Sequence, residues 1–146
     1  MISELVHSAQ FCYRHRLRFL ATLIEKFMIA TCSAHISGRA DIAKNVSFSH
    51  GGIGVIVNPA SSIGEGTIIS PHVVIGNRFP HKGCPQIGKH VYVGVGAKIL
   101  GGVKIGDNVK IGANAVVISD IPANCSAVGI PAKILYPKND VVKAKK

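Results

Sequence analysis

The sequence predicts an all-β fold in which short strands wind into a parallel β-helix, preceded by a short helical segment. Two observations carry this prediction. An apolar residue recurs at intervals of six or a multiple of six, with one interval of nine, and glycine often follows it. A helix needs apolar residues spaced near 3.6 and a lone strand near 2, so a period of six indicates short strands joined by similar turns. The repeating residues are Ile36, Ile42, Phe48, Val57, Ile63, Ile69, Ile75, Ile87, Val93, Ile99, Ile105, Ile111 and Val117.

Residues 1–33 precede the repeat, and their apolar side chains are spaced as in one or two amphipathic helices. We expect these helices to cover the open edge of the first coil, because an uncovered strand edge invites pairing with other chains. A basic cluster offers a second interpretation, a contact with an anionic membrane surface. The apolar residues are Leu5, Phe11, Leu17, Leu20, Leu23, Ile24, Phe27 and Met28, and the basic cluster is Arg14, His15, Arg16 and Arg18.

Residues 34–136 form the predicted β-helix domain, and residues 137–146 form a basic tail. Each hexad supplies one strand and one turn, and its aliphatic residue points toward the axis of the helix. The repeat is interrupted twice, by Ser49–Gly54 and by Asn77–Pro85. Functional residues concentrate on loops that a rigid scaffold holds in place, so these two interruptions are the places to look for a site.

The charge and composition of the chain limit the classes of partner and the location that we expect for it. Lys and Arg outnumber Asp and Glu by 17 to 7, which favours anionic ligands. Aromatic residues make up 5% and no nucleic-acid-reading motif is present, so we expect no nucleic-acid partner. The apolar stretch Phe19–Ile24 is far shorter than the roughly 18 residues of a membrane span, and no signal peptide is visible. The expected location is the cytoplasm, either free or at the inner face of the membrane.

His50 is the candidate catalytic residue of the first interruption. Histidine accepts a proton near neutral pH, because its ordinary pKa is about 6.5. Glycines beside it let backbone N–H groups approach a developing oxyanion. His72 follows about one coil later and His81 lies in the second interruption, so three histidines lie at or near the irregular surface.

Four segments of the repeat region carry a family resemblance. They are His50-Gly51-Gly52-Ile53-Gly54-Val55-Ile56-Val57-Asn58, Val73-Val74-Ile75-Gly76-Asn77-Arg78, Gly94-Val95-Gly96-Ala97-Lys98-Ile99-Leu100-Gly101 and Val128-Gly129-Ile130-Pro131-Ala132-Lys133-Ile134. These segments resemble the left-handed β-helix acyltransferases, in the branch related to serine acetyltransferases that includes exopolysaccharide and colanic acid O-acetyltransferases. The resemblance covers roughly residues 34–136 and implies a left-handed parallel β-helix of hexapeptide repeats.

The resemblance implies a homotrimer with acetyl-CoA sites in the grooves between neighbouring prisms. It implies direct acetyl transfer to a hydroxyl, with His50 as general base and no metal, and we expect a saccharide acceptor in bacterial polysaccharide biosynthesis. The pantetheine arm is expected along small residues and the CoA phosphates near a lysine. The implied CoA-binding residues are Asn77, Arg78, Val95, Gly96, Ala113 and Lys133, and the residues expected to bind the acceptor are His72, His81 and Cys84.

Two departures from the serine acetyltransferases favour the saccharide. The family's aspartate that orients the catalytic histidine falls on His35, and its second histidine, which helps to grip serine, falls on Cys84. The partner that orients His50 stays open between a backbone carbonyl, His35 and Asp41. Cys84 is interpreted as structural or as lining the acceptor site, since direct transfer needs no acyl-enzyme.

Alternative functions also stay open. They are a serine O-acetyltransferase-like enzyme for a small hydroxyl acceptor, a non-catalytic scaffold with basic ends, and a zinc enzyme that would use His72, His81 and His90. The cationic residues Arg78, His81 and Lys82 of the second interruption fit an acidic glycan, a CoA phosphate or a solvated loop.

Overall fold

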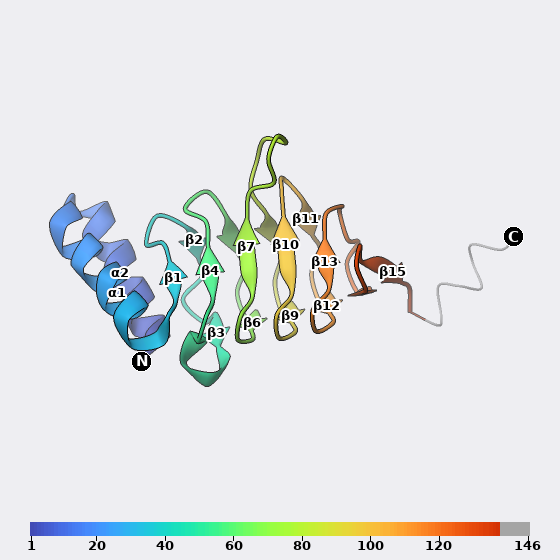
Figure 1. Ribbon diagram of the computed structural model, residues 1–146, viewed down its shortest axis with the longest axis horizontal. Coiled ribbons are helices and arrows are strands. Elements are labelled where there is room, and N and C mark those ends of the chain that lie inside the picture. Colours follow the sequence, from blue (N-terminus) through green and yellow to red (C-terminus); the bar gives the residue numbers. More distant parts are fainter. Residues whose placement is uncertain (138–146) are drawn as a thin grey trace, which may run out of the picture.

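A computed structural model describes residues 1–137 and confirms the parallel β-helix of hexapeptide repeats. The strands stack into three faces of a triangular prism (Figure 1). Face A consists of β1 (His35–Ile36), β4 (Ile56–Val57), β7 (Val74–Gly76), β10 (Lys98–Leu100) and β13 (Val116–Val117). Face B consists of β2 (Asp41–Ile42), β5 (Ser62–Ile63), β8 (Gln86–Ile87) and β11 (Lys104–Ile105). Face C consists of β3 (Ser47–Phe48), β6 (Ile68–Ile69), β9 (Tyr92–Val93), β12 (Lys110–Ile111), β14 (Ser126–Val128) and β15 (Lys133–Leu135).

The hexad residues form ladders inside the prism, in register from coil to coil. On face A, Val57 pairs with Ile75, and Ile75 pairs with Ile99. These side chains are at most 1% exposed, whereas the preceding residue of each strand points outward. Burial of an aliphatic side chain of this size stabilises the fold by about 1.5–3 kcal/mol. The period of six is therefore the period at which the chain returns a side chain to the axis.

The chain turns at three corners, each named here by the two faces that it joins. The B/C corner carries regular turns between the strands of those faces. The first interruption, Ser49–Gly54, lies at the C/A corner between β3 and β4, and the second, Asn77–Pro85, lies at the A/B corner between β7 and β8. In Figure 1 the two interruptions project beyond opposite ends of the face A strands. The strand β15 closes the far end by pairing antiparallel with β14.

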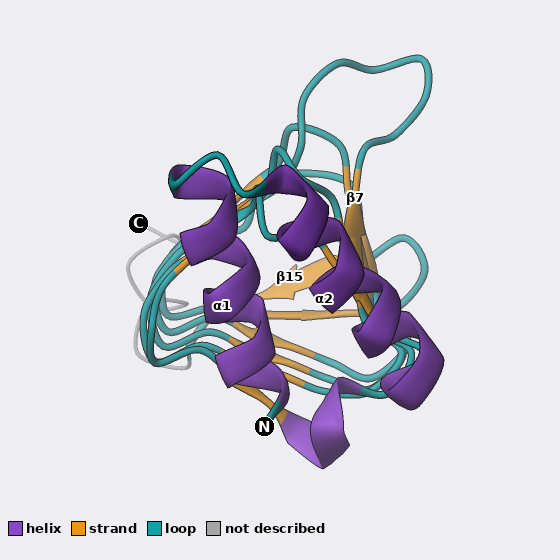
Figure 2. Cartoon of the chain, turned by 90° about the vertical axis from the view of Figure 1, so that its left-hand side faces the viewer, coloured by secondary structure: helices purple, strands orange, loops and turns teal. Residues whose placement is uncertain are grey.

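Two helices, α1 (Ile2–Arg14) and α2 (Arg18–Cys32), cover the N-terminal end of the prism (Figure 2). The edge of the first coil presents backbone carbonyls that lack a strand partner, and α1 supplies donors to them. The buried Gln10 Nε2 donates to the carbonyls of Ala40 and Ile42, at 2.9 and 3.2 Å, and Ser3 Oγ donates to Val46 at 3.3 Å. Because a buried carbonyl without a donor is costly, these contacts support the interpretation of the helices as a cap.

The helices bury only some of the residues that the apolar spacing suggests. Ile2, Val6 and Met28 join the core of the prism, and the partly buried Leu5 and Ile24 pack against it. At one point α1 approaches the first coil closely, since a Cβ on Gly38 would lie 2.8 Å from the Cβ of Ala9. Met28 is buried, but Phe11, Leu17, Leu20, Leu23 and Phe27 are 45–57% exposed.

Neither helix is long and apolar enough to cross a membrane, within the described residues. The predicted tail, 137–146, lies outside the described residues except for Pro137.

Candidate active site

His50 lies exposed at the C/A corner, in the turn η1 (Ser49–Gly52). Its backbone is left-handed, with φ of +51°, and Gly51 and Gly52 follow with φ of +69° and +70°. A left-handed backbone is uncommon for residues with a side chain. The successive left-handed residues accommodate the extra residues of this coil and account for the interval of nine in the repeat. The imidazole therefore lies on an insertion that is additional to the regular hexads of the prism.

His72 lies at the same corner in the next coil. Its backbone N–H donates to the carbonyl of Ile53 at 2.8 Å, and its left-handed backbone (φ +59°) brings its ring against Gly54. A Cβ on Gly54 would overlap the His72 ring, and Gly54 has a positive φ, so only glycine fits there. The structure thus places His72 directly beside the insertion that carries His50.

The corner continues through Val95 and Ala113 in the two following coils. The N–H of Gly96 donates to the carbonyl of Pro71 at 2.9 Å, and the N–H of Asn114 donates to the carbonyl of Val95 at 2.8 Å. Val95 is 46% exposed, and Ala113 is exposed. We call the four residues His50, His72, Val95 and Ala113 the C/A column. Its members lie at the same corner in four successive coils and change from imidazole to small aliphatic groups.

The loop Asn77–Pro85 places the other candidate residues at the A/B corner. Arg78, His81 and Lys82 line a shallow hollow of about 360 Å³, together with Asp120 and the backbone of Gly101. Asn77 is exposed at the start of this loop. Near its end the half-buried Cys84 Sγ donates to Asn58 Oδ1 at 3.2 Å.

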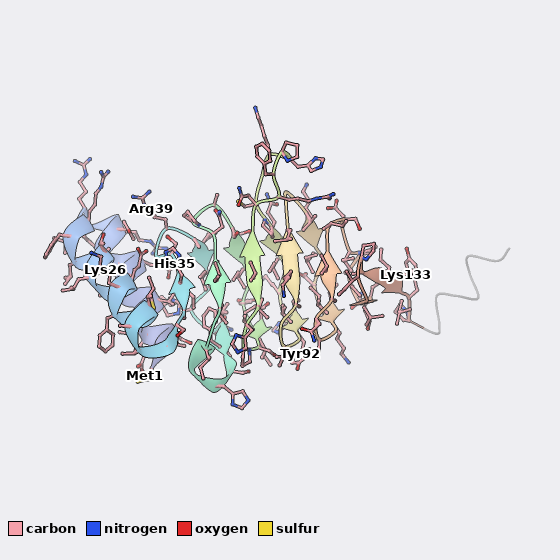
Figure 3. The ribbon with its side chains drawn as sticks, viewed as in Figure 1. Met1, Lys26, His35, Arg39, Tyr92 and Lys133 are labelled. Carbon is pink, nitrogen blue, oxygen red and sulfur yellow. The ribbon has the colours of Figure 1, made fainter. Side chains whose placement is uncertain are left out.

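One chain therefore does not bring all the candidate residues together. The C/A column and the loop lie at opposite ends of the face A strands, and Lys133 is exposed on β15 at the far end of the prism (Figure 3). The three histidines of the zinc alternative also lie apart: His72 is at the C/A corner, His81 at the A/B corner and His90 at the B/C corner. Residues 1–137 contain no group of three His, Cys, Asp or Glu side chains that could hold a metal ion.

The partners considered for His50 lie on different faces. His35 is exposed on β1 of face A, which borders the C/A corner, whereas Asp41 is on β2 of face B, which does not. The ion pair of Glu65 and Lys89, at 2.9 Å, lies at the B/C corner, away from both candidate groups. The hydrogen bond and charge of Lys89 lower the pKa of the Glu65 carboxyl from its ordinary value.

Asn58 is a residue of the A/B corner that the sequence analysis does not single out. It binds Cys84 from the preceding coil, and its Oδ1 also accepts the N–H of Ala60 at 3.0 Å. The sequence contains the signal for its position, because counting hexads places residues 58–61 at the same corner as the loop. No catalytic motif marks it, so only this count could have found it.

Comparisons with known proteins agree with the fold. Residues 84–119 match the family model described as bacterial transferase hexapeptide (six repeats). A serine acetyltransferase of Helicobacter pylori (strain J99) is 36% identical over 136 residues, which cover 87% of this chain and 79% of that protein. The serine acetyltransferase of Synechococcus elongatus is 32% identical over 130 residues, and the match spans 88% of this chain but only 53% of that protein.

Solved structures show the same likeness. The serine acetyltransferase of Neisseria gonorrhoeae in complex with serine matches 92% of this chain and 55% of its own, with a TM-score of 0.85 and 27% identity. A serine acetyltransferase in complex with CoA matches with the same coverage, a TM-score of 0.85 and 28% identity. The chain thus spans about half the length of these enzymes. From the repeat, the fold and these relatives, the chain belongs to the hexapeptide-repeat transferase family, and the relatives that it matches are serine acetyltransferases.

Proposed function

We propose that the chain is an acetyl-CoA-dependent O-acetyltransferase whose acceptor is a small hydroxyl compound of the serine type. The observation that carries the proposal is the position of His50, exposed on an insertion at the head of the C/A column, in a chain related to serine acetyltransferases. The imidazole accepts the proton of the acceptor hydroxyl as its oxygen attacks the thioester carbonyl carbon. The C–O bond forms and the C–S bond breaks, and the leaving CoA thiolate takes up the proton from the His50 imidazolium, which regenerates the free base.

The C/A column supports a binding path for the pantetheine arm. Below His72 the column consists of Val95 with its neighbour Gly96 and of Ala113, and small side chains let a thin chain lie close to the backbone. Lys133 on β15 is exposed beyond the last coils, where its cation would pair with the CoA phosphates. The CoA complex of a related enzyme with the same fold supports this ligand class.

We also propose that three chains assemble around a threefold axis. Within one chain the C/A column and the loop Asn77–Pro85 are separated by the length of the face A strands. A neighbouring copy that presents its loop to the His50 corner would join the two groups into one site. In such a trimer, Asn77, Arg78, His81 and Cys84 act on the substrates of the adjacent chain.

A saccharide is the second candidate acceptor, and specific observations favour it. The loop that would face the site carries Arg78, His81 and Lys82 over a hollow of about 360 Å³, and these cationic side chains can donate hydrogen bonds to hydroxyl or carboxylate oxygens. By the family resemblance, Cys84 falls where the serine acetyltransferases have a histidine, and its thiol, which donates to Asn58, would offer no second imidazole to an amino acid. The serine acetyltransferase relatives outweigh these features in our proposal.

The experiment that tests the proposal measures release of the CoA thiol from acetyl-CoA. We expect release that depends on serine, above the rate with acetyl-CoA alone, which is the control for hydrolysis. Release that depends on free or nucleotide-linked sugars, with no response to serine, would replace the proposed acceptor by a saccharide. Absence of acceptor-dependent release with both classes would contradict the transferase itself.

A further inference from the structure

We propose that the outer surface of the two N-terminal helices docks on an anionic lipid surface. The surface is built around an apolar stripe on α2 that faces away from the prism. We call Phe19, Leu20, Leu23 and Phe27 the outer stripe; they are 85%, 45%, 53% and 55% exposed. Their spacing places them along one side of the helix, opposite Ala21 and Met28, which are fully buried. Because α2 is apolar on both sides and the prism covers only one, its outer side exposes apolar groups that a partner can cover.

The flanks of the outer stripe are positively charged. Arg14, Arg16 and Arg18 lie in and beside the short connection between the helices, and Lys26 lies on α2 (Figure 3); all four are exposed. No salt bridge neutralises these four cations within the described residues. Arg39 extends the basic surface from the first coil, with its guanidinium 5.1 Å from the centre of the Tyr13 ring.

The two acidic residues of the helices do not oppose these cations. Glu25 turns toward the first coil, where its Oε1 accepts the N–H of Gly38 at 2.9 Å and its Oε2 accepts the Tyr13 hydroxyl at 3.3 Å. Glu4 pairs with the N-terminal amine at the other end of α1. Exposed aromatic and aliphatic groups beside cations are the composition by which helices bind anionic membranes in the plane of the surface.

Charge also decides between a membrane and a second copy of the chain. A copy docked through the same stripe would bring two sets of four exposed arginine and lysine side chains together, which opposes association. An anionic lipid surface complements the same charges. The lipid surface is therefore the occupant that the observations favour.

The position of the surface leaves the C/A column accessible. Both helices lie across the end of the prism and face the viewer in Figure 2, so a membrane against them would leave the three faces and their corners exposed to solvent. In the trimer proposed above, a threefold rotation places all three helical ends on the same side, and three weak contacts then reinforce one another. The gain in affinity from three simultaneous contacts depends on the proposed trimer. The contact that a single chain makes with the lipid surface does not depend on it.

Sedimentation of the whole protein with sucrose-loaded vesicles tests the proposal. We expect binding to vesicles of phosphatidylcholine with phosphatidylglycerol and much weaker binding to pure phosphatidylcholine. The double variant Arg14→Gln/Arg18→Gln should lower the partition coefficient by about tenfold or more. Its matched control, Lys104→Gln/Lys110→Gln, removes the same charge from exposed positions on β11 and β12 and should keep most of the binding.

A second variant tests the apolar contribution. Phe19→Ser/Leu23→Ser changes two exposed side chains and should lower binding by about tenfold or more, with the far-ultraviolet circular dichroism unchanged. Failure of the wild-type protein to sediment with anionic vesicles, or equal losses in the arginine and lysine variants, would overturn the proposal. A fall in molecular mass on Phe19→Ser/Leu23→Ser with no effect on vesicle binding would instead identify the stripe as an interface between copies. Because the assay uses no acetyl-CoA, its outcome is independent of the proposed enzyme activity.

Discussion

Replacement of His50 by asparagine is expected to lower kcat for acetyl transfer by about 10²–10⁴-fold, the usual contribution of a general base. The structure indicates that this variant removes the base without disturbing the fold. His50 is exposed, and asparagine tolerates the left-handed backbone that position 50 adopts. The amide keeps a polar group of similar reach but does not accept the hydroxyl proton. The effect is measured as acceptor-dependent CoA release, and the KM for acetyl-CoA should change little.

His90→Asn is the matched control for this prediction. His90 has the same left-handed backbone, with φ of +53°, but lies at the B/C corner outside both candidate groups. We expect this variant to keep the wild-type kcat. If His50→Asn retained full turnover while the acceptor was saturating, His50 would not be the base.

His72→Asn is expected to lower kcat/KM for the acceptor by about tenfold, mainly through KM. His72 lies in the coil next to the His50 insertion, with its ring against Gly54, so its imidazole borders the place where the acceptor hydroxyl must meet His50. Loss of one hydrogen bond to the acceptor costs about 1.4 kcal/mol, which corresponds to this factor. A change in KM with kcat nearly constant would identify binding and not chemistry as the role of this residue.

The same control separates a binding role from a structural one. The ring of His90 packs against Gly66 as the ring of His72 packs against Gly54, and each backbone N–H donates to a carbonyl at 2.8 Å. The two asparagine variants should therefore lose similar stability in urea unfolding. An equal effect of both variants on kcat/KM would show that His72 acts through the fold, and no effect of His72→Asn would remove it from the acceptor site.

The hexad repeat made most of the fold predictable. Its apolar residues occupy the ladders of all three faces, and the interval of nine between Phe48 and Val57 marks the one insertion at the C/A corner. These features are local in the sequence, because each coil repeats the geometry of the one before. The position of His72 beside that insertion follows from the same count.

The N-terminal helices show why part of the structure was not predictable. Periodic spacing in α2 occurs on two sides of the helix, and the spacing does not tell which side meets the prism. In the structure the side with Ala21, Ile24 and Met28 faces inward, and Leu23 and Phe27 remain outside. In the candidate site, the repeat places Arg78 and His81 at a corner, but in the trimer that we propose the residues facing them would come from a neighbouring chain, whose position a single-chain repeat does not determine.

Calorimetric titration of the purified protein with acetyl-CoA tests the central claim most directly. The account predicts saturable binding of one acetyl-CoA per chain, weakened in Lys133→Ala because the exposed Lys133 lies where the CoA phosphates are expected. Absence of binding to a protein whose circular dichroism shows the folded β-helix would contradict the account and favour a non-catalytic scaffold.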